Sequence, residues 1–437
     1  MTRTVGIRRE DKSEWERRVP LNPTALADLQ GSHDVRFQVQ PSEIRVYTDD
    51  DYRAAGIAIE EDLGEADLVF AVKEIPADLL RPGKTYVYFS HVIKGQPQNM
   101  PMLRRLMELG CSLVDYEKIV DLQGRRLVFF SLHAGYAGMI ETLWCLGKRL
   151  AARGVDTPLN EVRHAYEYGS LDAALEHLRG LGERIRAGGL DPGLRPIMFG
   201  LAGYGNVSRG CQEMLDALGA TEVPVADLAG HATRADEASP LLRVVFKEED
   251  MVEPVAPGGT FDLQDYYGNP EKYRGTFARH LPCLDVLVNA IYWDERYPRL
   301  VTKAWARESY TAKSSARLQV IGDISCDLEG GIELTVRTTP PDVPGFVYDP
   351  SADDALPGVD GVGPVVMAVD NLPCELPREA SDHFSDVLRE MVPDLVRADW
   401  TADFAELALP PSLKGAVIVH QGRLTSPYTY LQHHLES

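Results

Sequence analysis

The most informative stretch of this chain is FGLAGYGNVSRG, residues 199–210. It follows the apolar residues 197–199 and precedes a helical pattern of apolar side chains, so it predicts a strand, a turn and a helix. Gly203 and Gly205 allow a tight turn and a close approach of the backbone to phosphate, and the N-terminus of the following helix attracts the negative charge. The stretch therefore predicts a dinucleotide-binding turn, and about half of the chain precedes it.

This turn lacks the third glycine of the usual fingerprint. Ser208 stands at that position and Gly210 follows it, so the motif alone is weak. Asp227 lies at the end of a predicted strand at 222–225 and is the candidate partner of a ribose hydroxyl, with a turn or helix-capping aspartate as the alternative. Arg209 is the alternative partner for a 2′-phosphate, so these residues leave both NAD and NADP open.

The composition excludes several classes of protein. A length of 437 residues predicts two or three domains. The formal charge of −21 argues against nucleic acid or an anionic membrane as a partner, and the oligomeric state stays open, with a homo-oligomer as one alternative. The six cysteines are scattered singly, which predicts free thiols and no metal site. We expect a cytoplasmic protein, since no apolar run is typical of a signal peptide or a membrane span.

Strand-like and helix-like segments alternate along the chain. Short apolar runs predict strands at 4–7, 35–40, 67–72, 85–89, 112–116, 284–290, 318–324 and 365–369. Helical patterns are expected at 23–30, 102–109, 137–152 and 379–391, whereas the segment 335–363, rich in Pro, Asp and Gly, is interpreted as a crossover. Such alternation predicts parallel sheets that are covered by helices on both faces.

We therefore expect an α/β protein with two Rossmann-like doubly wound domains. Residues 1–136 and 345–437 are expected to form a discontinuous substrate and catalytic domain. Residues 137–344 are expected to form an NAD(P)-binding domain inserted into it. The helix at 137–152 is interpreted as the connection between the two.

Several further motifs accompany the glycine turn. They are ERRVPLNP at 16–23, VK at 72–73, FSH at 89–91, DYEK at 115–118, GRR at 124–126, AGYAG at 134–138, IYW at 291–293, GDIS at 322–325 and DNLP at 370–373. With these motifs nearly the whole chain resembles the lysine-forming saccharopine dehydrogenases, within the alanine dehydrogenase superfamily. The resemblance is closest to the lysine-ketoglutarate reductase half of bifunctional aminoadipic semialdehyde synthase, a branch in which serine is typical at position 208.

The resemblance implies a reductive condensation. The amine of L-lysine and the carbonyl of 2-oxoglutarate join through an imine, which NADPH or NADH reduces to saccharopine, and the resemblance favours NADPH. The alternatives are an opine or amino-acid dehydrogenase that uses another amine, and a non-catalytic dinucleotide-binding sensor. The second dehydrogenase activity of the bifunctional proteins is not expected in this chain. The residues expected to bind the cofactor are Gly203, Gly205, Asn206, Val207, Ser208, Asp227, Asn289 and Ile291.

An acid-base pair of Lys73 and His91 is implied by the same resemblance. Both residues follow consecutive predicted strands. Formation and reduction of the imine need protons moved onto and off oxygen and nitrogen. A lysine does this near neutral pH only if its pKa falls well below the ordinary value of about 10.4. Arg18, Arg126 and Lys94 are candidate cations for that shift.

The resemblance also implies the substrate-binding residues, and their charges suit the substrates; it selects Arg126 over the neighbouring Arg125, with a surface ion pair as the alternative for Arg126. Arg18 and Arg126 are expected to bind the carboxylates of the oxo acid, because the planar guanidinium binds carboxylates with two hydrogen bonds. Glu117 and Glu74 are expected to receive the ammonium group of the amino substrate. The remaining implied positions are Asp323, which is expected to orient His91, and Gln96 and Phe130, which line the substrate site or pack.

Overall fold

The computed structural model describes residues 2–194, 196–233, 239–311 and 316–436. The chain divides into two compact units. Unit 1 consists of Met1–Phe130 and Pro377–Ser437, and unit 2 consists of Ser131–Leu376. The chain thus enters and leaves unit 2 once, as an insertion into unit 1.

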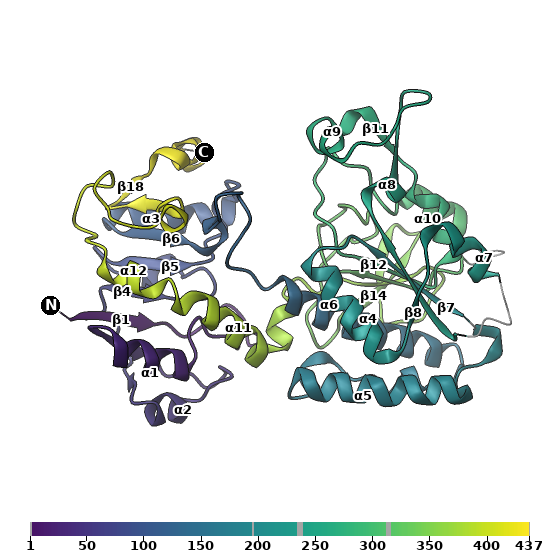
Figure 1. Ribbon diagram of the computed structural model, residues 1–437, viewed down its shortest axis with the longest axis horizontal. Coiled ribbons are helices and arrows are strands. Elements are labelled where there is room, and N and C mark those ends of the chain that lie inside the picture. The colour runs from purple at the N-terminus through teal and green to yellow at the C-terminus, as the bar shows by residue number, and fades with distance from the viewer. Residues whose placement is uncertain (1, 195, 234–238, 312–315, 437) are drawn as a thin grey trace. The chain divides into compact units, whose positions relative to one another are not determined.

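Unit 1 is built on an eight-stranded sheet with the order β18-β17-β6-β5-β4-β1-β2-β3 (Figure 1). Its strands are β1 (Arg3–Ile7), β2 (Val35–Val39), β3 (Ala58–Ile59), β4 (Leu68–Phe70), β5 (Thr85–Tyr88), β6 (Ser112–Asp115), β17 (Val417–His420) and β18 (Arg423–Leu424). The first six strands are parallel, and β17 and β18 are antiparallel. The strand order reverses between β1 and β4, and ligands of such sheets bind outside the carboxyl ends of the strands at this point.

The helices of unit 1 come from both ends of the chain. They are α1 (Pro23–Ser32), α2 (Asp49–Ala54), α3 (Met100–Glu108), α11 (Pro377–Arg389), α12 (Val392–Arg397), α13 (Pro411–Lys414) and α14 (Gln432–Glu436). The Asn22 side chain accepts a hydrogen bond from the backbone N–H of Ala25 and so caps α1. The Asn22 side chain also donates to Asp382 of α11 at 2.7 Å, which ties the two chain segments together.

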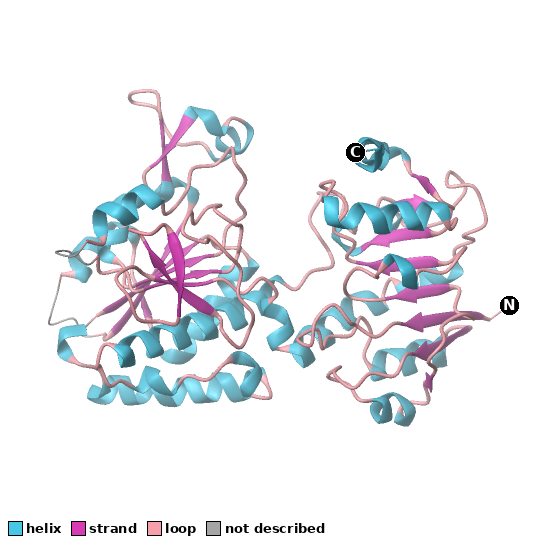
Figure 2. Cartoon of the chain, turned by 180° about the vertical axis from the view of Figure 1, so that it is seen from behind, coloured by secondary structure: helices cyan, strands magenta, loops and turns pink. Residues whose placement is uncertain are grey.

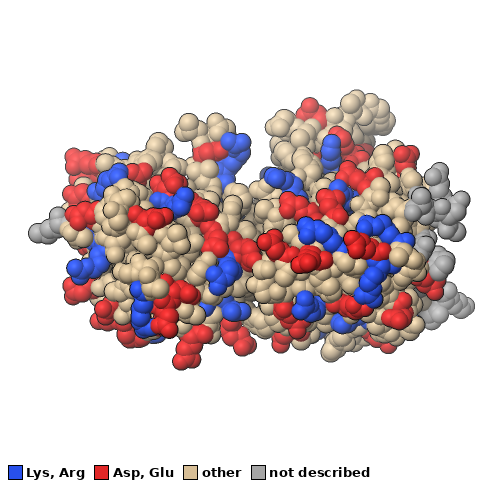
Figure 3. All heavy atoms as spheres, turned by 60° about the horizontal axis from the view of Figure 1, so that its bottom comes forward, with Lys and Arg blue, Asp and Glu red and all other residues tan. Residues whose placement is uncertain are grey.

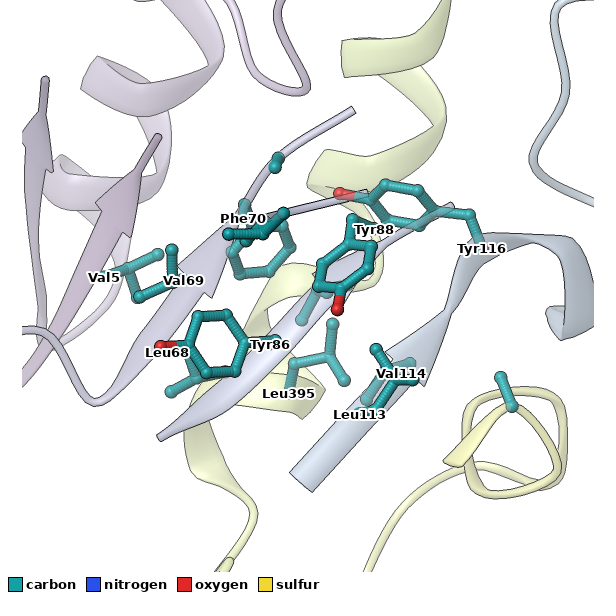
Figure 4. Close-up of a cluster of buried hydrophobic side chains, with 14 of the residues drawn as sticks. Val5, Leu68, Val69, Phe70, Tyr86, Tyr88, Leu113, Val114, Tyr116 and Leu395 are labelled. Carbon is teal, nitrogen blue, oxygen red and sulfur yellow. The ribbon is translucent and has the colours of Figure 1, made fainter. Parts of the chain in front are cut away.

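One apolar core fills unit 1. Side chains of the four strands β1, β4, β5 and β6 meet in it, as Val5, Phe70, Tyr88 and Val114 show (Figure 4). Leu395 of α12 packs into the same cluster. The C-terminal segment therefore completes the core that the N-terminal strands begin.

Unit 2 has a second eight-stranded sheet, with the order β15-β14-β16-β13-β12-β7-β9-β8. Its strands are β7 (Ile197–Ala202), β8 (Thr221–Glu222), β9 (Leu241–Phe246), β12 (Val286–Asn289), β13 (Val320–Asp323), β14 (Gly345–Asp349), β15 (Asp354–Pro357) and β16 (Val365–Met367). All are parallel except β14 and β15. A separate antiparallel pair consists of β10 (Val252–Pro254) and β11 (Tyr273–Gly275). The strand order reverses between β7 and β12.

Helices cover the strands of unit 2 (Figure 2). They are α4 (Ser131–Ala152), α5 (Leu171–Arg184), α6 (Asn206–Leu218), α7 (Leu228–Ala232), α8 (Glu248–Met251), α9 (Leu263–Gly268) and α10 (Lys303–Ser309). Helix α4 packs closely on α6, because a Cβ atom at Gly135 would lie 2.0 Å from the Val207 carbonyl oxygen. A Cβ atom at Gly210 would lie 2.4 Å from the Leu132 carbonyl oxygen. Gly210 thus allows α6 to pack closely on helix α4.

The structure differs from the predicted organisation at several points. The segment 335–363, interpreted as a crossover, contains β14 and β15, which pair in the sheet of unit 2. Residues 345–376, predicted to lie in the substrate domain, therefore belong to unit 2. The strand predicted at 222–225 is only two residues long, and β9 was not predicted. Arg243 interrupts the apolar run of β9, and it is accommodated by ion pairs with Asp216 and Glu222.

The charged side chains are mixed on the surface. On the face drawn in Figure 3, Lys and Arg side chains lie among Asp and Glu side chains rather than in one basic area. None of the helices in the described ranges is both long and apolar enough to cross a membrane.

Candidate functional site

The carboxyl ends of four neighbouring parallel strands in unit 1 carry a group of charged residues. Glu10 follows β1, Lys73 follows β4, His91 follows β5 and Glu117 follows β6. The strand pairs are in parallel register, so these ends share one edge of the sheet. The point between β1 and β4, where the strand order reverses, lies between Glu10 and Lys73.

Lys73 occupies an environment that disfavours its charged form. Burial lowers the pKa of the Lys73 ammonium, and the cations Arg18 and Lys12 lower it further, whereas Glu16 and Glu74 raise it. The sequence predicted an effect of Arg18, but the largest cause is desolvation. A lysine with a lowered pKa exchanges protons more readily near neutral pH.

His91 is held by a carboxylate of its own unit. Its Nδ1 lies 3.2 Å from Oε2 of Glu74, whose other oxygen accepts from Lys12. Burial raises the pKa of Glu74, but the hydrogen bonds from His91 and Lys12 prevail and lower it to about 2. The backbone of His91 has a positive φ of 50°, and the Asn99 side chain donates to its carbonyl at 3.0 Å. The imidazole orientation is therefore fixed from the side chain and the backbone.

Arg18 is buried and paired within the chain. Its Nε and Nη2 donate to the two oxygens of Glu16 at 2.7 and 2.6 Å. The guanidinium also lies 4.2 Å from the centroid of the Phe130 ring, which stacks on Phe384 at 4.5 Å. Glu16 was missed by the sequence analysis, although it stands two residues before Arg18 in the first motif. Phe130 packs against both Arg18 and α11.

The loop after β6 carries a second ion pair. Arg126 donates to Glu117, and Arg126 is half-exposed. The buried Asp115 accepts from the backbone N–H of Glu117 at 2.8 Å, and burial raises the pKa of Asp115 to about 6. Gln96 is half-buried, and its side chain accepts from the backbone N–H of Lys94 at 3.1 Å. Both glutamates predicted to bind an ammonium group are thus paired with a cation of the chain.

Unit 2 contains a cavity of about 500 Å³ at its own reversal point, between the ends of β7 and β12. This size is typical of a cofactor or small-molecule site. Its lining includes Gly203, Tyr204, Gly205, Glu248, Tyr267, Ile291 and Arg299. The glycine turn thus lines this cavity.

The two glycines of the turn have different surroundings. Gly203 has a φ of +98°, and a Cβ atom there would lie 2.8 Å from Cγ2 of Ile291 and 3.0 Å from the Ala290 carbonyl oxygen. Gly205 caps α6, and a Cβ atom there would meet open space. The turn therefore forms a cradle at a helix N-terminus, and it fits the pyrophosphate of a dinucleotide.

The other predicted cofactor residues are spread over several surroundings. Asn206 is exposed on the first turn of α6, whereas Ser208 is buried and Val207 packs into the core. Asn289 ends β12, and its buried Oδ1 has no hydrogen-bond partner among the described residues. Asp227 is exposed at the end of a short turn, outside the residues that line the cavity.

The strand order explains why Asp227 lies outside the lining of the cavity. The strand beside β7 is β9, and β8 is the edge strand. The carboxylate that lines the cavity is therefore Glu248, which follows β9, and the Tyr267 hydroxyl donates to it at 2.6 Å. Glu248 was not predicted as a cofactor residue, because the segment 222–225 was expected to be the strand that follows the helix after the glycine turn, and β9 was not expected.

Asp323 is a buried carboxylate at the end of β13. It accepts from the Asn289 side chain at 2.8 Å, from Thr335 and from the backbone N–H of Cys326 at 3.2 Å. Burial raises the pKa of Asp323 to about 6. The structure gives Glu74 as the partner of the His91 ring, so the orienting role of Asp323 stays a prediction. No group of three or more metal-ligating side chains occurs among the described residues.

Comparisons with known proteins agree with this description. Residues 6–137 match the family model of the alanine dehydrogenase/PNT N-terminal domain. Solved structures show the same fold: L-alanine dehydrogenase has a TM-score of 0.62 at 17% identity, with 99% of each chain covered. The transhydrogenase from Sinorhizobium meliloti has a TM-score of 0.54 at 14% identity, with 97% of this chain and 99% of that chain covered. The chain is thus a two-unit α/β protein with the fold of L-alanine dehydrogenase.

Sequence relatives give a narrower assignment. The chain is 37% identical to alpha-aminoadipic semialdehyde synthase of Arabidopsis thaliana, covering 98% of this chain and 41% of the relative. It is 33% identical to the mitochondrial synthase of Bos taurus, covering 98% and 47%. It is 26% identical to the lysine-forming, NAD(+) saccharopine dehydrogenase of Neurospora crassa, covering 92% and 93%.

The chain is therefore similar, over nearly its whole length, to the alpha-aminoadipic semialdehyde synthases and to the lysine-forming saccharopine dehydrogenases, and its residues 6–137 match the alanine dehydrogenase/PNT N-terminal domain. This confirms the predicted resemblance and the predicted fold class. The chain spans less than half the length of the first two synthases.

Proposed function

We propose that this protein is an NAD(P)H-dependent reductase that joins L-lysine and 2-oxoglutarate into saccharopine. The observation that carries the proposal is the environment of Lys73 at the carboxyl ends of the strands of unit 1. A lysine with a lowered pKa, a histidine oriented by a carboxylate and a buried arginine are the groups that this chemistry needs. The names of the relatives and the dinucleotide-type cavity of unit 2 support it.

The proposed reaction uses the acid-base pair in three proton transfers. The lysine side-chain amine adds to the ketone carbon of 2-oxoglutarate, and the resulting carbinolamine loses water to give an imine. The imine carbon then receives a hydride, and the nitrogen becomes a secondary amine. Lys73 takes one proton from the attacking amine and returns it to the carbinolamine oxygen, and His91 gives that oxygen a second proton, so that water leaves and a protonated imine remains. Addition of hydride to its carbon then gives the neutral secondary amine without a further proton. The bound dinucleotide supplies the hydride.

The charged residues of unit 1 fit the ends of the substrates. We assign Arg18 to a carboxylate of the oxo acid, since its guanidinium is already oriented by Glu16. The ion pair of Arg126 and Glu117 is complementary to the zwitterionic end of an amino acid. In this assignment Arg126 binds the carboxylate of lysine, rather than that of the oxo acid as expected from the sequence, and Glu117 binds the α-ammonium group of lysine.

For the cofactor we propose NADH rather than the NADPH that the resemblance favours. Glu248 lies at the end of the strand beside the glycine turn, where a carboxylate accepts from a ribose 2′-hydroxyl and repels a 2′-phosphate. The preference for NADH is measured as kcat/KM with NADH divided by kcat/KM with NADPH. Glu248→Gln is expected to lower this ratio about tenfold, which corresponds to about 1.4 kcal/mol. Asp227→Asn is the control and is expected to leave the ratio unchanged. An unchanged ratio in Glu248→Gln contradicts this assignment.

The function is tested by a substrate screen. NADH and NADPH are each incubated with 2-oxoglutarate and with lysine, ornithine or ammonia, and oxidation is followed at the nicotinamide absorbance. The proposal requires oxidation that depends on lysine and a product with the mass of saccharopine. Equal or faster oxidation with ammonia identifies an amino-acid dehydrogenase instead. Cofactor binding without oxidation for any pair identifies a sensor.

A further inference from the structure

On the side that faces β1, the backbone that carries Lys73 is held by a side chain rather than by a strand. The Arg8 N–H donates to the Phe70 carbonyl at 2.8 Å, and the pairing of β1 with β4 ends there. The N–H groups of the two residues after Ala71 then meet the carboxylate of Glu10. The Val72 N–H donates to its Oε1 at 2.7 Å and the Lys73 N–H to its Oε2 at 3.0 Å. Glu10 thus continues the hydrogen bonding of the sheet up to Lys73.

The same short segment holds the neighbour of Lys73 as well. Lys12, two residues after Glu10, donates to the Glu74 carboxylate, and Glu74 in turn orients His91. The segment 8–12 therefore binds the segment 72–74 through the backbone and through a side chain. A shift of Glu10 would be transmitted to both members of the acid-base pair.

Glu10 is buried where its carboxylate accepts from the Val72 and Lys73 N–H groups. Its carboxyl is 7% exposed and lies within the charged group around Lys73. Burial raises the pKa of Glu10, and the nearby Glu16 raises it further, while the two backbone N–H groups and Arg8 lower it. Burial, and then the charge of Glu10, raise the pKa of the nearby Tyr116 hydroxyl. An apolar residue at this position would leave the Val72 and Lys73 N–H groups without this acceptor.

We propose that Glu10 is a positioning residue that holds Lys73 in the geometry required for proton transfer. The inference rests on the proposed function. A carboxylate can satisfy both N–H groups at once, whereas a protonated carboxyl loses acceptor capacity toward one of them. Displacement of a reacting group by about 1 Å lowers a rate by about 10²-fold.

The test compares Glu10→Ala and Glu10→Gln with the unchanged protein. Turnover is measured with the substrates that the unchanged protein accepts, and the ionisation of Lys73 is measured by competitive acetylation across pH with mass spectrometry. For Glu10→Ala we expect kcat to fall about 10²-fold and the pKa of Lys73 to rise toward its ordinary value, as the side chain becomes more solvated. Glu10→Gln keeps one acceptor oxygen, so its loss is expected to be about tenfold.

The control is Asp67→Asn at the other end of the same strands. Asp67 accepts from the Thr4 backbone N–H at 2.9 Å, so this variant weakens a comparable contact far from Lys73. It is expected to change neither kcat nor the acetylation of Lys73.

The acid limb of the profile of kcat against pH is expected to move to lower pH in Glu10→Gln, because this variant lacks the ionising carboxyl.

Three outcomes decide the proposal. Unchanged kcat and unchanged Lys73 acetylation in a folded Glu10→Ala protein overturn it. If Glu10→Ala does not fold, the same two readouts in Glu10→Gln decide in its place. A shifted acetylation of Lys73 in a protein without lysine-dependent turnover supports the role of Glu10 and contradicts the proposed function, because the labelling needs no substrate.

Discussion

Replacement of the two glycines in the turn after β7 by alanine is expected to separate folding from cofactor binding. At Gly203 an alanine must adopt a φ of +98° and place its Cβ atom 2.8 Å from the Ile291 side chain. The positive φ costs about 1–2 kcal/mol, and overpacking adds about 1–3 kcal/mol. Gly203→Ala is therefore expected to lower the stability of unit 2 by about 2–5 kcal/mol and its Tm by at least about 4 °C.

Gly205 has an ordinary φ of −75° and open space around its Cα atom. Gly205→Ala is expected to cost less than about 1 kcal/mol of stability, the usual difference at a helix N-cap. Its methyl group would stand where the backbone approaches the pyrophosphate, so we expect at least tenfold weaker binding of NADH, about 1.4 kcal/mol.

The assay combines thermal unfolding with calorimetric titration of NADH for both variants. Normal NADH affinity in Gly205→Ala would refute the view that this turn cradles the phosphates. An unchanged Tm in Gly203→Ala would refute the steric reasoning.

Further predictions concern catalysis, stability and pH. Lys73→Met is expected to lower kcat/KM by about 10²–10⁴-fold while NADH affinity, measured by calorimetry, stays unchanged; near-normal kcat/KM would end the assignment of Lys73 as an acid-base group. Arg149 is buried in α4 and donates to the carbonyls of Val359, Gly361 and Gly363, so Arg149→Leu should destabilise unit 2 by about 3 kcal/mol or more in denaturant unfolding. Glu375 is buried, and burial raises its pKa well above the ordinary value of about 4.3, so the folded state keeps a proton that the unfolded state has already lost. The stability that the protonated Glu375 carboxyl contributes is thus fully present below about pH 4, and it is lost as the pH rises from there through the pKa of Glu375 in the folded state. The advantage of Glu375→Gln over the unchanged protein in unfolding free energy should therefore grow by about 1.4 kcal/mol per pH unit in that window, and a constant difference would contradict it.

Much of the fold could be predicted because its signals are local. The turn at Gly203, the helix after it and most parallel strands of unit 1 follow from glycine positions and short apolar runs. The order of the strands in each sheet cannot be predicted in this way, because strands that lie side by side in the sheet are often far apart in the sequence. For this reason the position of β9 beside β7 was not predicted. Asp227 was predicted to bind the ribose, whereas the carboxylate that lines the cavity is that of Glu248.

The candidate site divides in the same way. Lys73, His91 and Arg18 stand in motifs, and the structure gathers them at one edge of one sheet. Glu16 and Glu10 could not be recognised as buried carboxylates, because their burial depends on segments that lie far away in the sequence. Glu10 accepts from N–H groups more than sixty residues along the chain, and no spacing rule predicts such a contact.

The central claim is that this chain transfers hydride to an imine of lysine and 2-oxoglutarate. It is tested most directly with reduced dinucleotide that carries deuterium at both hydrogens of nicotinamide C4, incubated with lysine, 2-oxoglutarate and the protein. The account predicts saccharopine that contains one deuterium atom per molecule. Deuterium in glutamate or in a hydroxy acid, or saccharopine without deuterium, would contradict it.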